Sequence, residues 1–540
     1  MISRRRMLGA GGAGLAAAGL GLAGCRSDNQ GGGGSGSEAA AFETPTYQAY
    51  TGVEPTLPAL DNGTSPYFEA FPSEMPTFST APPGSGSTVR VHTFLNSSPR
   101  PVEDNQWWQA LNEATGVTFE LTGAPIGDYP SKFQTVMAGG EVDDLTSILP
   151  DSTPELAKLL EATFQDLTDY VSGDAILEYP GLANIPSVVW DACTYNGRIY
   201  TLPIHRFALT HGYAVRTDVA EERGAPTEPK NGEEFYEMFK ALSDPAKGTF
   251  ATNNAVWLVE IVAEMMGVPN DWGIEGGKFV KDIEVPQYLE ALEFVRRCWE
   301  EKMIHPSAWE ANFSLQTQDL YNEGTAPFVI GGLTWMGNAA NAEKLYPEAR
   351  SNTFTMMKWD GSGPAERYVG GGAPYQTALK KGDDARIKEL LGVINWLASP
   401  FGTKEYRLFR NGIEGRHYEL DSDGNTVPIE DNKVENMGPL IYAGSAPQVH
   451  NSLYPHYSEA GYHHEAEAMD HALVLPTLSL ESETGQTKNA QLNKLLTDAR
   501  SDIITGRKPV SSWADTIENW KSKGGDKVRQ EYEESLAAQE

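Results

Sequence analysis

Aromatic side chains are the residues of this sequence whose chemistry is easiest to interpret. The chain contains 12 Trp and 22 Tyr residues. A flat ring stacks on the apolar C–H face of a sugar, while neighbouring polar groups bond to its hydroxyls. Trp335 follows the pair Gly331-Gly332, where a large ring can stand free, and Trp257 and Tyr375 are further candidate stacking platforms. The alternative for each of these rings is a place in the hydrophobic core.

Two polar side chains are candidates to complete such a site. His205 and Arg206 follow the apolar stretch Tyr200–Ile204, where groups that contact a substrate are expected. Arg206 offers forked donors to hydroxyls or to a carboxylate, because its guanidinium is planar and always charged. The alternative for Arg206 is an ordinary surface charge.

Two short motifs have residue types that bind metals. The stretch Asp421–Asn425 has its glycine in the fourth place, whereas a calcium-binding EF-hand loop needs it in the sixth, so a hairpin turn is the better interpretation. His463, Glu467 and His471 share one helical face, but they do not form the zinc motif H-E-x-x-H, and a solvated face is favoured. We therefore expect no metal and no cofactor.

The N-terminus has the features of an export signal. Arg4–Arg6 precede an uncharged run over 7–24, as in a secretory signal peptide. The stretch Ser3–Leu8 resembles the twin-arginine export motif. Leu22–Cys25 resembles a bacterial lipobox, in which a diacylglycerol is attached to the cysteine thiol. A transmembrane anchor is the alternative, but seven glycines make the uncharged run a poor membrane helix.

We therefore interpret residues 1–24 as a signal peptide and Cys25 as the lipidated first residue of the mature chain. Residues 25–87 are rich in Gly, Ser, Thr and Pro. Such a composition predicts a flexible tether followed by an extended spacer that can wrap around the folded part. The protein is then expected at the extracellular face of a bacterial cytoplasmic membrane, attached to it by lipid alone.

Composition limits the remaining possibilities. A net charge of −32, from 42 basic and 74 acidic residues, disfavours nucleic acid as a partner, because phosphates would be repelled. The length after the spacer is too great for one ordinary core, so two lobes are expected. Cys193 and Cys298 either pair in an oxidising compartment or remain as two buried thiols.

Hydrophobic patterning predicts strands and helices in alternation from residue 88. This order is typical of a parallel sheet covered by helices, and a second series of the same kind begins near Tyr213. The predicted strands of the first series are 88–95, 117–125 and 143–149, and its predicted helices are 104–116 and 128–140.

Several segments in a fixed order then identify a family. The chain resembles the extracellular solute-binding lipoproteins of carbohydrate ABC transporters (family 1), in the subgroup with LplA- and alginate-binding-type proteins. The resemblance runs from about Thr88 to the C-terminus. The segments that carry it are Asn112–Thr122, Gly127–Leu145, Asn196–Pro203, Tyr213–Leu242, Gly331–Asn338, Leu397–Val427 and Ile503–Gly524.

This resemblance implies an α/β, periplasmic-binding-protein-like fold of type II, in which two α/β lobes are joined by a multi-crossing hinge. We expect an N-terminal lobe from 88–208 plus 333–371, and a C-terminal lobe from 209–332 plus 372–540. By analogy, the chain crosses between lobes near Phe207–His211, Gly331–Leu333 and Gly371–Pro374. Loops at the carboxyl ends of the strands then face the ligand.

The family also implies site residues. Asp144 corresponds to an acidic residue that bonds sugar hydroxyls, and we expect its loop, 139–144, at the ligand edge. Gly371 lets the backbone approach a ligand closely. The ligand-binding residues expected are Asp144, His205, Arg206, Trp257, Trp335, Gly371 and Tyr375.

The function implied is non-enzymatic. A monomeric, lipid-anchored receptor would capture an oligosaccharide or related small solute and deliver it to the membrane subunits of an ABC permease. A secreted glycoside hydrolase is one alternative, although no stretch singles out the pair of carboxylates that it needs. A lipoprotein that senses a solute for a membrane kinase is another, and it would share every feature described above.

Overall fold

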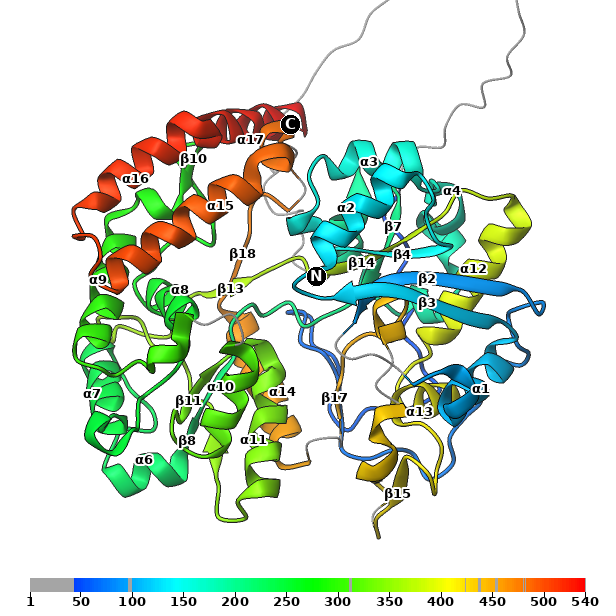
Figure 1. The fold of residues 1–540 in the computed structure, drawn as a ribbon, viewed down its shortest axis with the longest axis horizontal. Coiled ribbons are helices and arrows are strands. Elements are labelled where there is room, and N and C mark those ends of the chain that lie inside the picture. Colours follow the sequence, from blue (N-terminus) through cyan, green and yellow to red (C-terminus); the bar gives the residue numbers. More distant parts are fainter. Residues whose placement is uncertain are drawn as a thin grey trace, which may run out of the picture.

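The computed structural model describes residues 43–539, apart from 96–99, 310–312, 423, 436–438, 452–454, 479 and 481. Two α/β lobes lie side by side, joined by segments that cross between them (Figure 1). The two α/β lobes joined by several crossings that were expected from the sequence are confirmed. The predicted signal peptide and Cys25 lie outside the described residues.

The first lobe is built on a five-stranded sheet in the order β3-β2-β4-β14-β7. Strands β3 and β4 run parallel to β2, whereas β14 is antiparallel to both of its neighbours. The strands are β2 (Thr88–Leu95), β3 (Thr118–Pro125), β4 (Leu145–Ile148), β7 (Thr201–Ile204) and β14 (Tyr375–Leu379). The helices of this lobe are α1 (Gln106–Thr115), α2 (Tyr129–Gly139), α3 (Leu156–Thr163), α4 (Thr168–Val171), α5 (Pro180–Ala183), α12 (Asp384–Leu397) and α13 (Lys404–Asn411).

Local signals placed the first helices and turns of this lobe correctly. Helix α1 ends at Gly116 and α2 at Gly140, both in the left-handed conformation (φ of 69° and 73°) that glycine adopts without strain. The Asn196-Gly197 pair joins β5 (Thr194–Tyr195) to β6 (Arg198–Ile199) in a hairpin, with both φ angles positive. These elements form as expected because their determinants lie within a few residues of one another.

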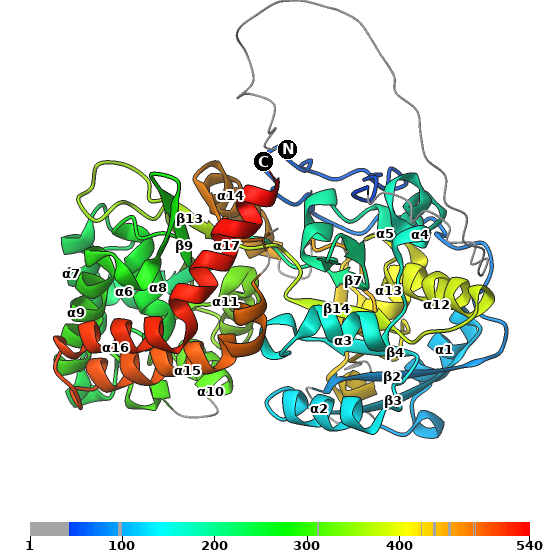
Figure 2. The same cartoon turned by 90° about the horizontal axis from the view of Figure 1, so that it is seen from above.

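The second lobe is helix-rich around the small sheet β11-β8-β12. Its strands are β8 (Tyr213–Arg216), β9 (Trp272–Glu275), β10 (Lys278–Lys281), β11 (Phe328–Ile330) and β12 (Ser351–Asn352). Its helices are α6 (Thr217–Arg223), α7 (Gly232–Leu242), α8 (Ala255–Met265), α9 (Pro286–Glu300), α10 (Phe313–Asn322), α11 (Trp335–Leu345), α14 (Pro455–Asp470), α15 (Glu483–Ile504), α16 (Ser512–Trp520) and α17 (Asp526–Gln539). Figure 2 shows α15 and α17 on the side of this lobe next to α3.

The crossing segments pair with one another between the lobes. Residues 205–212 run antiparallel to 367–374, with backbone bonds from Arg206 to Gly372, from Gly370 to Ala208 and from Thr210 to Tyr368. Strand β13 (Arg367–Val369) also pairs with β18 (Ala472–Val474). Crossings near Phe207–His211 and Gly371–Pro374 were expected. The segment 331–333 is not a crossing, because it joins β11 to α11 inside the second lobe.

The lobe boundaries differ from those expected. Strand β14 inserts between β4 and β7, and α12 packs in the core of the first lobe, so residues 375–397 belong to that lobe rather than to the second. Helix α11 packs against β8 and α14 in the second lobe, although 333–371 had been assigned to the first. The chain exchanges lobes because a sheet is completed by a strand that returns from a distant part of the sequence.

The segment before β2 wraps both lobes, as an extended spacer can. Thr46 bonds to Gly173 of the first lobe, and Phe78 and Ser79 donate their backbone N–H groups to Glu405. Between these contacts, the Ser65 N–H donates to Glu465 of α14. Further pairing joins β1 (Tyr67–Phe68) to β17 (His450–Asn451). The part of the predicted spacer that the structure describes is therefore docked on the fold.

Cys193 and Cys298 are both free and buried, in the cores of different lobes. Burial raises the pKa of each thiol to about 12, so neither is a reactive thiolate. Among the residues described, no helix has both the length and the apolar character to span a bilayer.

A buried ionic cluster fixes two crossing segments to the second lobe. Glu264 of α8 contacts His211 Nδ1 through Oε1 and Arg367 Nε through Oε2, each at 2.6 Å. Both carboxylate and guanidinium are essentially inaccessible to water. Because His211 and Arg367 belong to paired crossing segments, one carboxylate anchors both segments to α8.

Glu264→Gln should lower the free energy of unfolding by about 3–5 kcal/mol, because it removes the carboxylate that contacts the buried Arg367 guanidinium. Urea unfolding measures this loss. The matched control is Glu233→Gln, which removes an exposed carboxylate from α7 in the same lobe. Equal stabilities for the two variants would contradict the anchoring role.

Candidate functional site

One edge of the first-lobe sheet collects the carboxyl ends of β2, β4 and β7 together with the amino end of β14. His205 and Arg206 directly follow β7, and Tyr375 begins β14 opposite Ile204. In open α/β sheets, ligands bind outside the carboxyl ends of the strands. We refer to this edge as the ligand edge. Three residues expected from the sequence meet there.

The Arg206 side chain lies against two aromatic rings at the ligand edge. Its guanidinium carbon is 5.5 Å from the centre of the Tyr375 ring and 5.7 Å from that of Tyr442. Both tyrosine rings also contact Phe94 of β2, at centroid distances of 5.2 and 4.0 Å. Phe94 is fully buried. The half-buried Arg206 guanidinium therefore lies against two tyrosine rings that pack on the buried Phe94 ring.

His205 has a supporting role in this arrangement. Its buried Nδ1 accepts a hydrogen bond of 3.0 Å from the Gln448 N–H. Burial, with a smaller contribution from the neighbouring Arg206, lowers the pKa of His205 to about 3. The imidazole is therefore neutral near pH 7, and it joins residues 205–212 to the segment that leads into α14.

Gly371 lies in the crossing segment beside these residues. A Cβ added there would stand 3.2 Å from the Leu478 side chain and 3.3 Å from that of Ala192. The position is therefore crowded by the protein itself. Its neighbour Gly372 has a positive φ of 71° and accepts the Arg206 backbone N–H. Gly372 thus has, at the pairing of the two crossing segments, a backbone conformation that glycine adopts without strain.

Trp257 is the expected residue that the second lobe contributes. It stands near the start of α8 with 38% of its surface exposed, and its ring centre is 6.1 Å from that of His211. A Cβ at Gly331 would come within 3.1 Å of the Trp257 ring, so glycine allows this ring its position. Gly331 also donates its N–H to Gly212, next to the crossing. Trp257 therefore lies at the end of the second lobe that is nearest to the hinge.

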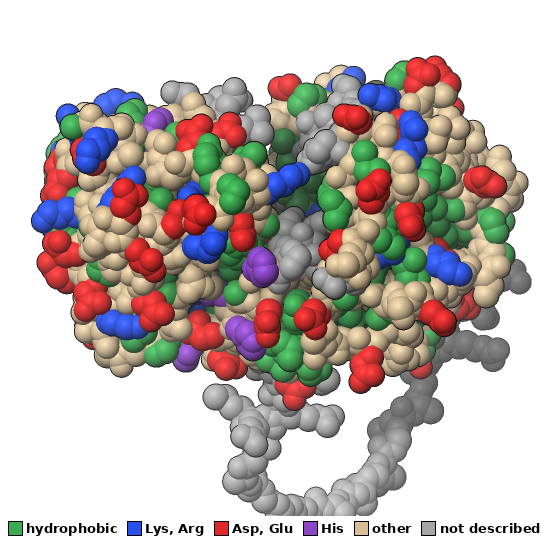
Figure 3. Space-filling view, turned by 90° about the horizontal axis from the view of Figure 1, so that it is seen from below, with side chains coloured by type: hydrophobic (Ala, Val, Ile, Leu, Met, Phe, Trp, Pro, Cys, Tyr) green, Lys and Arg blue, Asp and Glu red, His purple; other side chains and the backbone are tan. Residues whose placement is uncertain are grey.

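A groove separates the two lobes on the face seen in Figure 3. Hydrophobic side chains are visible along its walls. The lobes also contact each other away from the crossings, where Lys158 of α3 pairs with Glu483 of α15 at 2.8 Å and the Glu155 N–H bonds to Gln486. Aromatic and polar groups thus stand in both lobes near a shared hinge.

Two expected residues lie elsewhere. Asp144 precedes β4, so its loop is at the amino end of that strand and not at the ligand edge. Its carboxylate accepts the Arg90 N–H at 2.9 Å and pairs with Arg386 at 3.1 Å. These contacts explain the acidic residue as part of the sheet's opposite edge, and we do not include it in the proposed site.

Trp335 begins α11 instead of standing free in a loop. Its ring is 0% exposed and packs edge-on against Tyr457 and His464, each at a centroid distance of 6.3 Å. Gly212 of the crossing segment approaches the same ring, since a Cβ there would be 3.0 Å away. The expected stacking platform is therefore a core residue in this structure.

Tyr442 and Asn253 were missed by sequence reasoning. Tyr442 ends a short 3-10 turn, Pro439–Tyr442, far along the chain from the residues that it contacts. Asn253 precedes α8, is 1% exposed, and its side-chain Nδ2 has no hydrogen-bond partner within the described residues. The only feature of the sequence that could have indicated Asn253 is the pair Asn253-Asn254 before a helix. Asn254 is explained as the N-cap of α8, whereas Asn253 is not.

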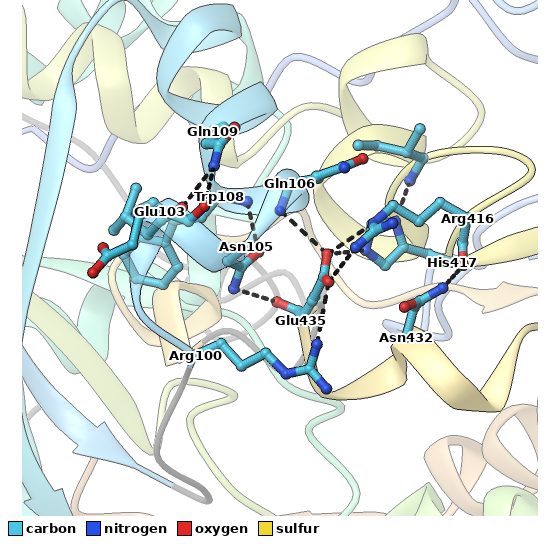
Figure 4. Close-up of polar contacts among 12 residues, drawn as sticks. Arg100, Glu103, Asn105, Gln106, Trp108, Gln109, Arg416, His417, Asn432 and Glu435 are labelled. Carbon is cyan, nitrogen blue, oxygen red and sulfur yellow. Dashed lines mark hydrogen bonds and ion pairs between the residues drawn. The ribbon is translucent and has the colours of Figure 1, made fainter.

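Glu435 fixes the segment that leads to Tyr442 (Figure 4). Its buried carboxylate accepts hydrogen bonds from Arg416, His417 and the Gln106 N–H, and its backbone oxygen accepts from Asn105. The bonds from Arg416 lower the pKa of Glu435, although burial opposes this. This cluster joins α1 to the Arg416-His417 stretch, which the sequence marked for its family resemblance.

The residue types that bind metals are not clustered among the residues that the structure describes. No cluster of three or more His, Cys, Asp or Glu side chains suited to a metal occurs among the residues described. Strands β15 (Tyr418–Leu420) and β16 (Thr426–Pro428) pair as a hairpin around 421–425, as the turn interpretation predicts. His463 is exposed and lies 3.9 Å from Glu459.

Comparison with known proteins shows to which family this chain belongs. Residues 106–407 match the family described as bacterial extracellular solute-binding protein. Lipoprotein LipO of Bacillus subtilis (strain 168) is 25% identical over 472 residues, covering 82% of this chain and 91% of LipO. The polygalacturonan/rhamnogalacturonan-binding protein YtcQ of the same strain is 23% identical, covering 79% of this chain and 87% of YtcQ.

A solved structure agrees with the fold. The alginate-binding protein AlgQ2, in its crystal structure without calcium ion, superposes with a TM-score of 0.65 at 15% identity. The match covers 84% of this chain and 99% of AlgQ2. At this identity the likeness concerns the fold alone, and it extends over both lobes.

His205 should make stability sensitive to acid. Its pKa is about 3 in the folded chain and about 6.5 when unfolded, so the unfolded chain binds the proton first as pH falls. This contribution is complete above about pH 6.5 and declines toward pH 3, by at most about 1.4 kcal/mol per pH unit. His205→Asn supplies an acceptor that does not titrate.

Between pH 7 and pH 4 the unfolding free energy of the wild type should therefore fall more than that of His205→Asn. Urea titrations at each pH measure it. Parallel pH profiles for the two proteins would show that His205 is not held neutral in the fold.

Proposed function

The chain belongs to the bacterial extracellular solute-binding protein family, and on that premise we propose that it is the receptor of an ABC importer for oligosaccharides. In this proposal the sugar binds in the interlobe groove, in contact with Arg206 and Tyr375 on one side and Trp257 on the other, while His205 supports the segment that carries Arg206. The receptor then delivers the sugar unchanged to the permease subunits in the membrane. The names of YtcQ and AlgQ2, both polysaccharide binders, support carbohydrate as the ligand class.

The observation that carries this proposal is the placement of aromatic rings at the hinge end of both lobes. Tyr375 and Tyr442 stand at the ligand edge of the first lobe, and Trp257 stands half-exposed in the second. Rings on both sides suit a sugar, whose two faces carry C–H groups that stack on aromatic surfaces. Asn253 offers a buried amide donor for a hydroxyl on the side of Trp257.

Ligand binding is expected to work by a shift in population between open and closed forms. A solute that contacts both lobes only when they are closed stabilises the closed form by that difference in affinity. The permease would recognise the closed arrangement of the two lobes. A lipid on Cys25 would keep the receptor near its permease and so raise its effective concentration there.

Thermal-shift and calorimetric screening against oligosaccharides of graded length tests the proposal. Binding should raise the melting temperature, because the ligand stabilises only the folded chain. Chromatography of the same mixtures after incubation should return the glycan intact. Release of reducing ends would favour the glycoside hydrolase instead, and failure of every glycan to bind would reject the carbohydrate receptor.

Trp257→Ala should weaken binding of the glycan found in that screen by about 1–3 kcal/mol, with little change in melting temperature, because the ring is half-exposed. Trp257→Phe keeps a ring and should retain most of the affinity. The matched comparison is Trp335→Ala, which empties a core position and should lower stability by about 3–5 kcal/mol. Unchanged affinity in Trp257→Ala would remove this residue from the site.

Cys25 lies outside the described residues, and its lipidation is part of the proposal. Expression in a bacterial host with a labelled fatty acid should label the wild-type protein and place it in the membrane fraction, since two acyl chains anchor a protein stably. Cys25→Ser should lose the label. Equal labelling of both proteins would exclude Cys25 as the lipidated residue.

A further inference from the structure

Arg206 is half-buried and has no acidic partner among the residues that the structure describes. Arg216, Arg367 and Arg500 each pair with a carboxylate, at 2.7, 2.6 and 3.1 Å. Arg407 lacks such a partner, but its guanidinium is covered by Phe71, 4.1 Å from the ring centre. Unlike Arg216, Arg367 and Arg500, Arg206 therefore has no described carboxylate that balances its charge.

The surroundings of Arg206 supply no negative charge. Its side chain donates a hydrogen bond of 2.8 Å to the His205 backbone oxygen and also bonds with the Tyr442 side chain, and no described carboxylate lies within 4 Å. Burial lowers the pKa of Arg206, and the second guanidinium of Arg410 adds to this effect. A cation that is partly removed from water and left without a counter-ion is unfavourable, so an incoming anion gains more here than at an exposed arginine.

The two neighbouring tyrosine rings indicate which kind of anion would fit beside Arg206. Tyr375 and Tyr442 lie beside the guanidinium and are held by the fully buried Phe94. The planar fork of arginine matches a carboxylate with two parallel hydrogen bonds. A sugar ring that carries a carboxylate would place its C–H face on a tyrosine and its charge on Arg206. A neutral sugar would leave the guanidinium charge uncompensated.

Building on the proposed receptor function, we propose that Arg206, Tyr375 and Tyr442 form a subsite for a carboxylate-bearing sugar unit, so that the ligand is an acidic oligosaccharide. The rest of the chain, with its net charge of −32, repels anions at long range. Selection for the acidic unit then depends on this local contact. The subsite is held at the hinge, because Arg206 is bonded through its backbone N–H to Gly372 of the opposite crossing segment.

The test compares trimers of galacturonate, glucuronate, mannuronate and guluronate with their methyl esters, and includes neutral hexose trimers. Each pair has the same ring and linkage and differs in charge. Calorimetry on the wild-type protein should find an acid form bound roughly tenfold or more tighter than its ester, the increment expected of a charge-assisted contact. This comparison needs no variant.

Arg206→Gln should abolish the preference for the acid form, whereas Arg206→Lys should keep part of it, because the charge remains and the fork is lost. Arg90→Gln is the matched control. It removes an exposed guanidinium, 3.5 Å from Asp143, from the same lobe, and it should leave the preference unchanged.

The outcomes separate the two proposals. Binding of neutral trimers or esters alone, or an acid preference that survives in Arg206→Gln, would overturn the carboxylate subsite while the oligosaccharide receptor stands. Failure of every acidic and neutral member to bind would count against the receptor itself, and the subsite would fall with it.

Discussion

The contact of Glu264 with both His211 and Arg367 is the interaction on which the arrangement of the lobes depends. Residues 205–212 and 367–374 are bonded to each other, but neither segment has a core of its own. A buried carboxylate that binds a side chain from each segment fixes both to α8. The part of both crossing segments nearest to His211 and Arg367 is therefore attached to the second lobe, whereas their other ends continue into β7 and β14 of the first lobe.

The sequence predicted features that depend on neighbouring residues and failed where distant segments meet. Helix α1 ends at Gly116 and the Asn196-Gly197 hairpin forms because their determinants are local. The lobe boundaries were wrong because β14 enters the sheet between β4 and β7, a pairing that no local pattern specifies. The prediction that Trp335 is a free stacking platform failed for the same reason. Two preceding glycines suggested an exposed ring, but α11 packs against α14 and buries it. The sequence suggested Arg206 and Tyr375 as site residues, whereas Tyr442, which lies beside them in the fold, comes from a remote turn.

The N-terminal segment adds a second link between the lobes. Ser65 is bonded to α14 of the second lobe, and Phe78 and Ser79 are bonded to Glu405 of the first. Any motion that separates α14 from α13 must break these contacts or carry the segment with it. Glu465 accepts both the Ser65 N–H and His450 Nε2, so the segment is attached to a buried group rather than to the surface. The described segment before β2, which follows Cys25 in the sequence, thus contacts both lobes.

The same crossing that joins the lobes also carries the groups of the proposed site. Arg206 follows β7 by two residues, and its backbone is bonded to Gly372, three residues before Tyr375. A ligand held by the Arg206 and Tyr375 side chains would therefore contact both of these paired segments. Since Trp257 lies beside His211 at the anchored end of one of these segments, the second wall of the groove is set by the Glu264 contact.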